Sequence, residues 1–583
     1  MILYQALSSY QILECMLHRY FFYPNEHAVL LLGTYITERM PDYLSLHTQG
    51  FFDEICLFQF GGAGGKEEQI LEKMEKELKK ALPWKLTDFD RIFIAGIHTY
   101  LQVYMLHSGI SFEMFEDGSG ALSRPRILAD IHRASAPGRY EIIEKYGLYD
   151  HTSPLITKKY CDMKSQVPGF SDERAVDFSI LEYFRRLPID RQEAVRRIFQ
   201  VPALGEAPKE AVLLLTQQFA SLGQLTFDEQ ILIYENLMDY YLRGACLIIK
   251  PHPDDILYYR LLFPEAQIIR GQFPSELLPL AFEKLPERAA TISSTGLNLL
   301  KGEFSDILAF NAEYEKTFHF NHIYYAALSL ACFLGMNRAG VIGANPVQLE
   351  NLAERGPAAG RGLVIGDWED PGNREEEQGS AVTGYSDGIQ GPAGGQGSAG
   401  GETILFCDIA EEKGPSWKDL KELADRKAVR GILFFNTDKE YRMYEPDREI
   451  EPEEALAEAK AWFLRLIPIR VVKKRLGRRN TAGKGMPETA DRMETSEYAD
   501  REGEDMLYFY AAEEELRTMA RQFETELELP FTGTKLTAGG FSPEQEKIKM
   551  LEGILAATER RLLEYIREER VLRQRLEERE AKT

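Results

Sequence analysis

The sequence has few cysteines, and they form no recognisable motif. The six cysteines among 583 residues lie far apart, and none belongs to a C-x-x-C pair. Disulfide-stapled domains and zinc ribbons need close and regular cysteine spacings, so neither class fits this chain. We expect reduced thiols, most of them buried in hydrophobic cores, in a protein of the cytoplasm.

Long apolar runs and an excess of positive charge are also missing. No run reaches the ~20 apolar residues that a membrane-spanning helix needs, and no basic region precedes the first apolar residues, so we expect no signal peptide. The 69 Lys and Arg residues are outnumbered by 92 Asp and Glu residues, which leaves a formal net charge of -23. Nucleic-acid-binding proteins normally carry a basic face, so nucleic acid is not an expected partner.

Two segments come close to phosphate and metal motifs but depart from them. FGGAGGKEE is one residue too short for G-x-x-x-x-G-K-[ST], and Glu67 stands where that motif has a magnesium-binding hydroxyl. Asp88 and Asp90 have the spacing of a metal-binding acid pair, but they precede their predicted strand and lie at the amino end of the sheet. We expect no metal site.

What the chain does contain is an alternation of short apolar runs and helical patterns. Runs such as MILYQAL, AVLLLGTYI and RIFIAGI predict buried strands, and SSYQILECMLHRY and KEEQILEKMEKELKKAL predict helices between them. Apolar strands that alternate with helices form parallel sheets covered on both faces. We therefore expect an α/β fold with two doubly wound Rossmann-like domains that face a cleft, residues 1–201 and 202–338.

The composition changes after residue 338. Residues 339–402 are rich in Gly, Ser and Glu and predict a flexible linker. Residues 403–480 predict a small βαβ segment followed by a basic amphipathic stretch. Residues 481–583 predict a polar linker and long helices, with a capping box at Ser542. An imperfect leucine seam there indicates a coiled coil or a helical hairpin, and a homo-oligomer formed through these helices.

Polar residues follow the ends of predicted strands in both domains. Glu116, Asp117 and Gly118 follow ISFEM in the first domain, and His252 follows CLIIK in the second, with Pro253 behind it. In doubly wound sheets the carboxyl ends of the strands face the ligand. A carboxylate at that edge is placed to act as a general base, and the flanking prolines hold the imidazole at the strand tip.

Two further groups lie at the same predicted edge. Ser293, Ser294 and Thr295 stand between a strand and a helical pattern, where hydroxyls and free N–H groups suit one phosphate. Glu276, in QFPSELL, is placed to bind a pair of ribose hydroxyls. Each group taken alone also fits an ordinary turn or helix cap. Together they indicate a nucleotide with a single phosphate, handled without a metal.

The three motifs resemble those of the bacterial sialyltransferases, including the lipooligosaccharide and capsular polysialic acid enzymes. That family shares an acidic pair followed by Gly, a His-Pro pair and a Ser-Ser/Thr pair, in this order. The order and spacing here are similar, and the resemblance covers roughly residues 1–335. It implies a GT-B fold and an inverting, metal-independent transfer from CMP-sialic acid to a hydroxyl of a capsule or lipooligosaccharide glycan, without a cofactor.

The resemblance also implies roles for individual residues. Asp117 would deprotonate the acceptor hydroxyl, and His252 would serve the departing CMP phosphate as acid or charge stabiliser. Ser293 and Ser294 would bind that phosphate, and Glu276 would hold the cytidine ribose. The supporting positions are Thr295 and Pro253 beside the nucleotide, and Glu116 and Gly118 beside the base.

Other hypotheses remain open at this point. PHPDD also resembles the zinc motif of de-N-acetylases of the N-acetylglucosaminyl-phosphatidylinositol type, in which His252 and Asp255 would bind zinc and Asp254 would be the base. That family normally continues with Glu, where this chain has Ile256. Two further possibilities are the transfer of another sugar on the same fold and a degenerate transferase that acts as an assembly scaffold.

A basic stretch near residue 470 predicts contact with a membrane. FLRLIPIRVVKKRLGRR interleaves apolar and basic residues, a pattern that favours an anionic lipid interface. Pro468 breaks any single helix, so the contact should begin after it. We expect a protein that is peripheral on the inner face of the membrane, with the following contact residues: Lys473, Lys474, Arg475, Arg478 and Arg479.

Overall fold

The computed structural model describes the chain up to residue 523 with several gaps. The residues outside the description are 61–65, 136, 223, 226, 243, 256, 258, 272, 311–313, 357, 368–401, 410–415, 426–428, 436–451, 473–503 and 524–583. The described residues form two compact units. One contains residues 1–224 and 245–309, and the other contains 225–244 and 310–523.

The first unit begins with a seven-stranded sheet in which every neighbouring pair is parallel. The strand order is β3-β2-β1-β4-β5-β6-β7, a doubly wound order that reverses direction at the first strand. The strands are β1 (Ile2–Ala6), β2 (Ala28–Gly33), β3 (Glu54–Phe58), β4 (Arg91–Ile94), β5 (Phe112–Phe115), β6 (Ile156–Cys161) and β7 (Ala175–Asp177). The sequence did not predict β6 and β7, because Lys158 and Lys159 interrupt one apolar run and β7 has only three residues.

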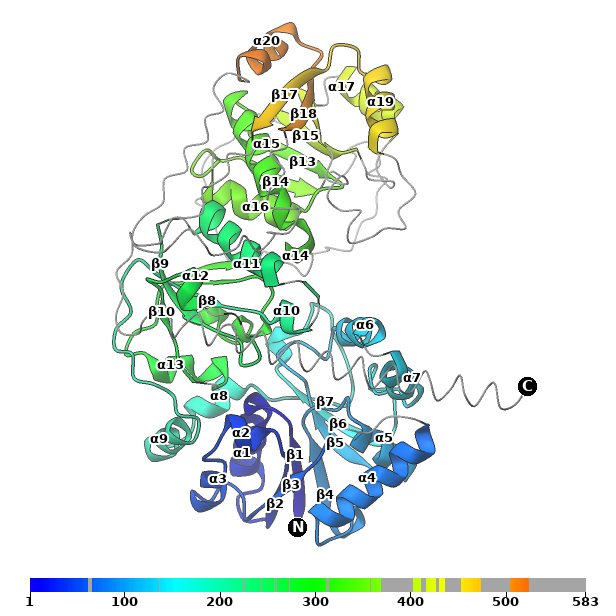
Figure 1. The fold of residues 1–583 in the computed structure, drawn as a ribbon, viewed down its shortest axis with the longest axis vertical. Coiled ribbons are helices and arrows are strands. Elements are labelled where there is room, and N and C mark those ends of the chain that lie inside the picture. The colour runs from blue at the N-terminus through cyan, green and yellow to red at the C-terminus, as the bar shows by residue number, and fades with distance from the viewer. Residues whose placement is uncertain are drawn as a thin grey trace, which may run out of the picture. The chain divides into compact units, whose positions relative to one another are not determined.

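Alternate residues of each strand enter two hydrophobic cores, one on each face of this sheet. Tyr4 and Leu30 belong to the first core, whereas their neighbours Leu3 and Val29 belong to the second. Helices cover both faces, as predicted (Figure 1). They are α1 (Ser9–Phe22), α2 (Ile36–Arg39), α3 (Ser45–Thr48), α4 (Glu67–Ala81), η1 (Leu86–Asp88), α5 (Tyr100–His107), α6 (Pro125–Ser135), α7 (Pro137–Lys145), η2 (Met163–Ser165), α8 (Ile180–Arg185) and α9 (Ile189–Ile198).

A second parallel sheet of five strands completes the first unit, so the predicted pair of Rossmann-like sheets is confirmed. Its order is β10-β9-β8-β11-β12, with β8 (Ala211–Leu215), β9 (Cys246–Lys250), β10 (Gln267–Ile268), β11 (Arg288–Thr291) and β12 (Asp306–Ala309). The shorter elements around it are α10 (Phe219–Leu222), α12 (Tyr259–Leu262), η4 (Ser275–Leu277), α13 (Leu278–Ala281), η5 (Thr295–Leu297) and η6 (Lys301–Glu303).

The helical pattern that follows Thr295 in the sequence, GLNLLKG, does not form an α-helix in this part of the structure. The segment forms two short 3-10 turns, η5 and η6, instead. Gly296 and Gly302 fall within seven residues, and each glycine costs about 1 kcal/mol relative to alanine in a helix. Two such costs outweigh the weak apolar periodicity on which the prediction rested.

The second unit contains a third sheet, which corrects the predicted linker. Its order is β14-β13-β15-β16-β18-β17. Residues 338–367 form β13 (Arg338–Ile342), α16 (Pro346–Arg355) and β14 (Val364–Asp367) of this sheet, so the linker prediction is wrong there. Asn345 caps α16 by accepting from the Gln348 N–H, a start signal that the Gly-rich and Glu-rich sequence further on obscured. Residues 368–401 lie outside the described residues.

The predicted βαβ segment after residue 402 is part of this same sheet. Strands β15 (Thr403–Asp408) and β16 (Gly431–Phe435) are parallel neighbours, with α17 (Trp417–Asp425) between them in sequence. The remaining elements of the unit are α11 (Phe227–Asn236), the π-helical turn η3 (Leu237–Tyr241), α14 (Tyr314–Thr317), η7 (Phe318–Phe320), α15 (Asn321–Phe333), α19 (Pro452–Trp462), β17 (Ile467–Val472), β18 (Glu504–Tyr510) and α20 (Glu514–Phe523).

The start of the basic stretch is a core strand rather than a lipid-facing surface. Strand β17 pairs antiparallel with β18, and Ile469 lies opposite Leu507. Phe463 and Ile469 are buried, so these two apolar side chains of the stretch pack inside the protein. Strand β18 and helix α20 also replace part of the polar linker predicted over 481–583. The predicted contact residues Lys473, Lys474, Arg475, Arg478 and Arg479, and the predicted coiled coil, lie outside the described residues.

Within the described ranges, no helix is both long enough and apolar enough to cross a membrane.

Candidate active site

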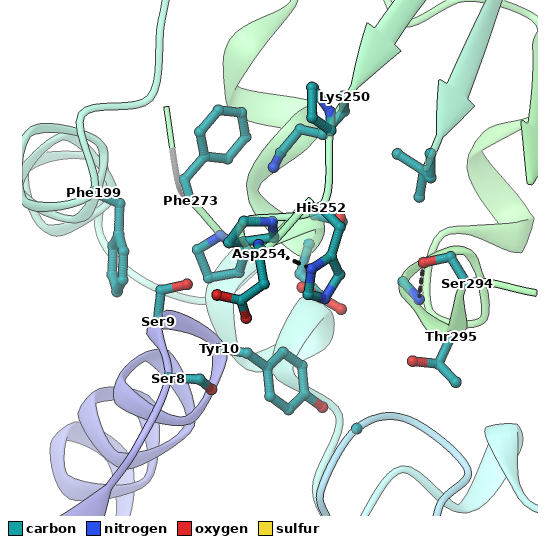
Figure 2. Close-up of a pocket in the computed structure, with 18 of the residues that line it drawn as sticks. Ser8, Ser9, Tyr10, Phe199, Lys250, His252, Asp254, Phe273, Ser294 and Thr295 are labelled. Atoms are coloured by element: carbon teal, nitrogen blue, oxygen red, sulfur yellow. Dashed lines mark hydrogen bonds between the residues drawn. The ribbon is translucent and has the colours of Figure 1, made fainter. Parts of the chain in front are cut away.

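A cavity of about 510 Å³ lies in the first unit, lined by both of its sheets (Figure 2). The first sheet contributes the turn from β1 to α1 and the loop after β5. The second sheet contributes the residues that follow β8, β9 and β11. All of these segments are at the carboxyl ends of parallel strands, where doubly wound sheets bind ligands. A volume of this size suits a small organic ligand such as a sugar nucleotide.

The loop after β5 is organised by a buried carboxylate, that of Glu116. Its oxygens accept hydrogen bonds from the backbone N–H groups of Gly120, Leu122 and Asp162, and from the side-chain amide of Gln166. Burial raises the pKa of Glu116 to about 7 against these donors. Glu116 therefore stabilises the loop by binding its backbone, and Glu116 is not among the residues that line the cavity.

Asp117, the next residue, lines the cavity and is exposed to it. The side-chain amide of Gln11 donates a hydrogen bond to its Oδ1 at 2.8 Å. Burial within the surrounding protein raises the pKa of Asp117, whereas this hydrogen bond and the charges of His132 and Arg139 lower it. The carboxylate is thus held at the cavity wall with its proton affinity increased, which suits a general base.

Gly118 brings the two sheets' loops together beside Asp117. Its φ of 95° lies in the left-handed region, and a Cβ at this position would lie 3.5 Å from the Thr295 hydroxyl. The neighbouring Ser119 carbonyl accepts a hydrogen bond from the Asn298 side chain at 3.1 Å. The predicted acidic motif and the predicted hydroxyl motif are therefore adjacent in space.

His252 follows β9, and its turn fixes the tautomer of its ring. The backbone N–H of Asp254 donates to Nδ1 at 3.1 Å. A backbone N–H can only donate, so the Nδ1 atom accepts, and the neutral ring carries its proton on Nε2. The His252 backbone N–H is bound in turn by the hydroxyl of Thr216, a buried residue that follows β8. The imidazole lines the cavity.

The zinc arrangement expected of a de-N-acetylase does not fit this turn. Asp255, the second ligand in that hypothesis, accepts hydrogen bonds from the hydroxyls of Thr216 and Tyr259 and from the Leu257 N–H. These contacts make Asp255 the structural anchor of the turn. In the described part of the chain, no group of three or more His, Cys, Asp or Glu side chains is arranged to hold a metal ion.

The hydroxyl motif after β11 reaches the cavity in part. Ser294, Thr295 and Gly296 line it, whereas Ser293 is not among the lining residues. The Ser294 Oγ accepts from the Gly296 N–H at 3.3 Å, and the Ser294 N–H donates to Thr291. The Ser294 hydroxyl keeps its own proton, so it remains able to donate to an anion in the cavity.

Glu276 and Lys250 form a buried charged pair at the cavity, with Phe273 beside them. The Lys250 ammonium lies 4.5 Å from the centroid of the Phe273 ring. Burial lowers the pKa of Lys250 to about 8 and raises that of Glu276 to about 7, and each charge partly opposes the shift of the other. Glu276 was predicted from the sequence as a site residue, but Lys250 was not. A lysine that ends an apolar strand, as in CLIIK, is the signal that could have found it.

The first turn of α1 also belongs to the site, although it was not predicted from the sequence. Ser8, Ser9 and Tyr10 line the cavity, and the Ser8 hydroxyl caps the helix by accepting from the Gln11 N–H at 3.2 Å. Behind them, Glu14 is buried and hydrogen-bonded to Tyr10, and burial raises its pKa well above the usual value. The turn follows β1, so the rule that pointed to Asp117 and His252 points to it too.

The first unit has two parallel α/β sheets whose carboxyl ends line one cavity, which is the arrangement of the GT-B fold. Residues 54–312 match the model of glycosyltransferase family 52, a family of bacterial sialyltransferases, so the resemblance to these enzymes is confirmed. The match covers both sheets in large part and ends before the third sheet begins.

Parts of the chain are also similar to individual proteins. An uncharacterized protein of Haemophilus influenzae is 24% identical over 187 residues, which is 32% of this chain and 58% of that protein. The chain therefore spans less than two thirds of the length of this curated relative. One similar solved structure is Medicago truncatula UGT71G1 complexed with UDP-glucose, which is 11% identical, covers 56% of this chain and 83% of its own chain, and gives a TM-score of 0.34. Another is the glycotransferase of kitacinnamycin, which is 12% identical, covers 63% of this chain and 86% of its own chain, and gives a TM-score of 0.32.

Proposed function

We propose that this protein transfers sialic acid from CMP-sialic acid to a hydroxyl of a bacterial cell-surface glycan, by an inverting mechanism that needs no metal. One observation carries the proposal: Asp117 from the first sheet and His252 from the second line the same cavity. The transfer needs a base on the acceptor side and hydrogen-bond donors on the leaving phosphate, and the cavity offers both.

Asp117 acts as the base in this proposal. Its carboxylate takes the proton of the acceptor hydroxyl as the oxygen attacks the anomeric carbon of the sugar. The raised proton affinity of the Asp117 carboxyl favours this step, and acid–base assistance of this kind typically contributes about 10²–10⁴ in rate.

His252 and the hydroxyl motif act on the departing CMP. The reacting sugar becomes cation-like while negative charge grows on the phosphate, so donors aimed at the phosphate stabilise the transition state. The Nε2–H of the neutral His252 ring and the Ser294 and Thr295 hydroxyls are such donors. A hydrogen bond to a charged group contributes about 1.5–3 kcal/mol. The tautomer supports a role for His252 as charge-stabilising donor rather than as imidazolium acid.

Glu276 completes the donor site by binding the cytidine ribose. Its side chain is buried at the cavity wall, after the loop that carries Phe273 and Pro274. A carboxylate accepts from two neighbouring hydroxyls at once, which is the pattern that a ribose offers. Nearby Lys250 favours the ionised form that this contact requires.

The test is CMP release from CMP-sialic acid in the presence of EDTA and a glycan acceptor. Release should continue in EDTA and should fall by about 10²–10⁴ in His252→Ala. His27→Ala removes an imidazole that is 46% exposed and bonded to Glu54, away from the cavity, and serves as the matched control. Full activity in His252→Ala would contradict the proposal, and so would release that stops in EDTA. Release from another sugar nucleotide alone would change the donor and keep the class.

We also propose that the basic residues after β17 bring the enzyme to an anionic membrane, where lipid-linked acceptors lie. The support is the cluster of positive charge on a chain whose net charge is -23. The assay is co-sedimentation with vesicles that contain anionic lipid. Replacing Lys473, Lys474 and Arg475 by Glu should reduce the bound fraction, and unchanged binding would remove this part of the proposal.

A further inference from the structure

We propose that Gln11 is a positioning residue, which holds the Asp117 carboxylate in its reactive orientation from a helix in a distant part of the sequence. The inference rests on the proposed role of Asp117 as the base. Gln11 lies in the first turn of α1 and is buried.

The side-chain amide of Gln11 is fixed at both of its ends. Its Oε1 accepts a hydrogen bond from the Leu7 N–H at 2.7 Å, and its Nε2 donates to Asp117 Oδ1 at 2.8 Å. Because the Leu7 N–H can only donate, the amide oxygen must face Leu7 and the NH₂ group must face Asp117. The reversed amide would set two donors against each other on one side and two acceptors on the other.

A glycine after β4, the strand that pairs with β1, leaves room for this amide. Gly96 follows β4, and its φ of 80° is a conformation that favours glycine. A Cβ at position 96 would lie 2.9 Å from Nε2 and 3.0 Å from Oε1 of Gln11, and 2.7 Å from a methyl group of Leu7. The amide thus packs against the bare backbone of Gly96, which prevents it from swinging away from Asp117.

The two oxygens of the Asp117 carboxylate have different roles in this arrangement. Oδ1 accepts from Gln11, and no other hydrogen bond reaches this carboxyl from the described residues. Oδ2 is therefore the oxygen that receives the proton of the acceptor hydroxyl. The hydrogen bond to Oδ1 restricts rotation of the carboxylate, so the second oxygen keeps a preferred direction for the incoming hydroxyl.

Several charged groups set the proton affinity of Asp117 together with Gln11. His132 of α6 and Arg139 of α7 favour the carboxylate, as the donated hydrogen bond does, whereas burial opposes it. On α1, the neighbouring Tyr10 and Glu14 both interact with the Asp117 charge. Removing the Gln11 donor should therefore raise the pKa of Asp117 and move the acidic limb of the pH–rate profile to higher pH.

The principal variant is Gln11→Glu. It keeps the shape of the side chain and an acceptor for the Leu7 N–H, and it exchanges the donor that faces Asp117 for a carboxylate. We expect kcat to fall by about 10- to 100-fold, unchanged affinity for CMP, and an acidic limb moved to higher pH. Gln11→Met, which removes the donor without adding a charge, should move the limb in the same direction and by less.

A second variant moves the amide without changing residue 11. In Gly96→Ala the added methyl group displaces the Gln11 side chain, so the acidic limb should move as it does in Gln11→Met. The pKa of Asp117 can also be read without turnover, from the carboxyl ¹³C resonance of protein labelled at aspartate, with Asp117→Asn to assign the signal. This measurement holds for any donor sugar.

The outcomes separate this inference from the proposed function. Activity that survives in Asp117→Asn would remove the base and this inference with it. An inactive Asp117→Asn together with a wild-type kcat and acidic limb in Gln11→Glu would overturn the Gln11 inference alone. The Gln11 inference would also be overturned if weaker CMP affinity and a lower melting temperature accounted for the whole loss of activity in Gln11→Glu. In that case the acidic limb of the pH–rate profile and the ¹³C titration of Asp117 would stay at their wild-type positions, and Gln11 would be merely structural.

Discussion

Thr216 links the position of His252 to the stability of the second sheet, and Thr216→Val tests this link. The buried hydroxyl accepts from the His252 backbone N–H at 3.1 Å and donates to Asp255 Oδ2 at 2.9 Å. Valine keeps the branched shape but can make neither hydrogen bond. The substitution should therefore loosen the turn that carries the imidazole and also lower the free energy of unfolding.

The magnitude follows from the two bonds. A neutral hydrogen bond contributes about 0.5–1.5 kcal/mol and one to a charged group about 1.5–3 kcal/mol, so their loss should cost about 2–4 kcal/mol. Urea denaturation followed by tryptophan fluorescence and far-UV circular dichroism measures this change. CMP release measures the second consequence, a reduced kcat because His252 no longer keeps its direction.

Two variants make the experiment specific. Thr216→Ser retains the hydroxyl and should recover most of the activity. Thr48→Val removes an exposed hydroxyl whose 3.4 Å contact with the Ser45 carbonyl is weak, and it should change stability by less than about 0.5 kcal/mol. If Thr216→Val matched the wild type in both unfolding and CMP release, the argument that the turn orients His252 would be wrong.

Two further predictions concern the cavity wall. Burial lowers the pKa of Lys250 to about 8 in the folded protein, below its ordinary 10.5. Between these two pH values the unfolded chain binds one more proton than the folded protein, so the free energy of unfolding should rise with pH by up to about 3 kcal/mol. Lys250→Met should remove this rise, and urea titrations that show the same pH dependence in both proteins would refute the burial argument. Gly118→Ala places a residue with a side chain at a positive φ and directs its methyl group toward Thr295. The substitution should lower the free energy of unfolding by about 1–2 kcal/mol and weaken CMP binding in calorimetry. Wild-type CMP affinity would show that the loop tolerates a Cβ.

The sheets and the motif positions were predictable because they depend on local sequence. The apolar runs of β1, β8 and β9 are long enough to be buried on both faces, and that pattern is visible without a structure. The carboxyl ends of parallel strands share one edge, so Asp117, His252 and Ser294 could be assigned to a common site. Strands β13 and β14 of the third sheet were missed because they stand directly before a Gly-rich and Glu-rich segment, and the composition of that segment suggested a linker.

What the sequence determined by itself is which segments are buried and which polar residues follow them, because burial and backbone conformation leave a periodic record in the chain. Only the tertiary structure determined the role of each polar residue. Of two adjacent acids, Glu116 supports a loop and Asp117 faces the cavity, and Asp117 meets Gln11 across a separation of 106 residues. Hydrogen bonds between such distant residues depend on the placement of strands and helices in space, and no periodicity in the sequence encodes that placement.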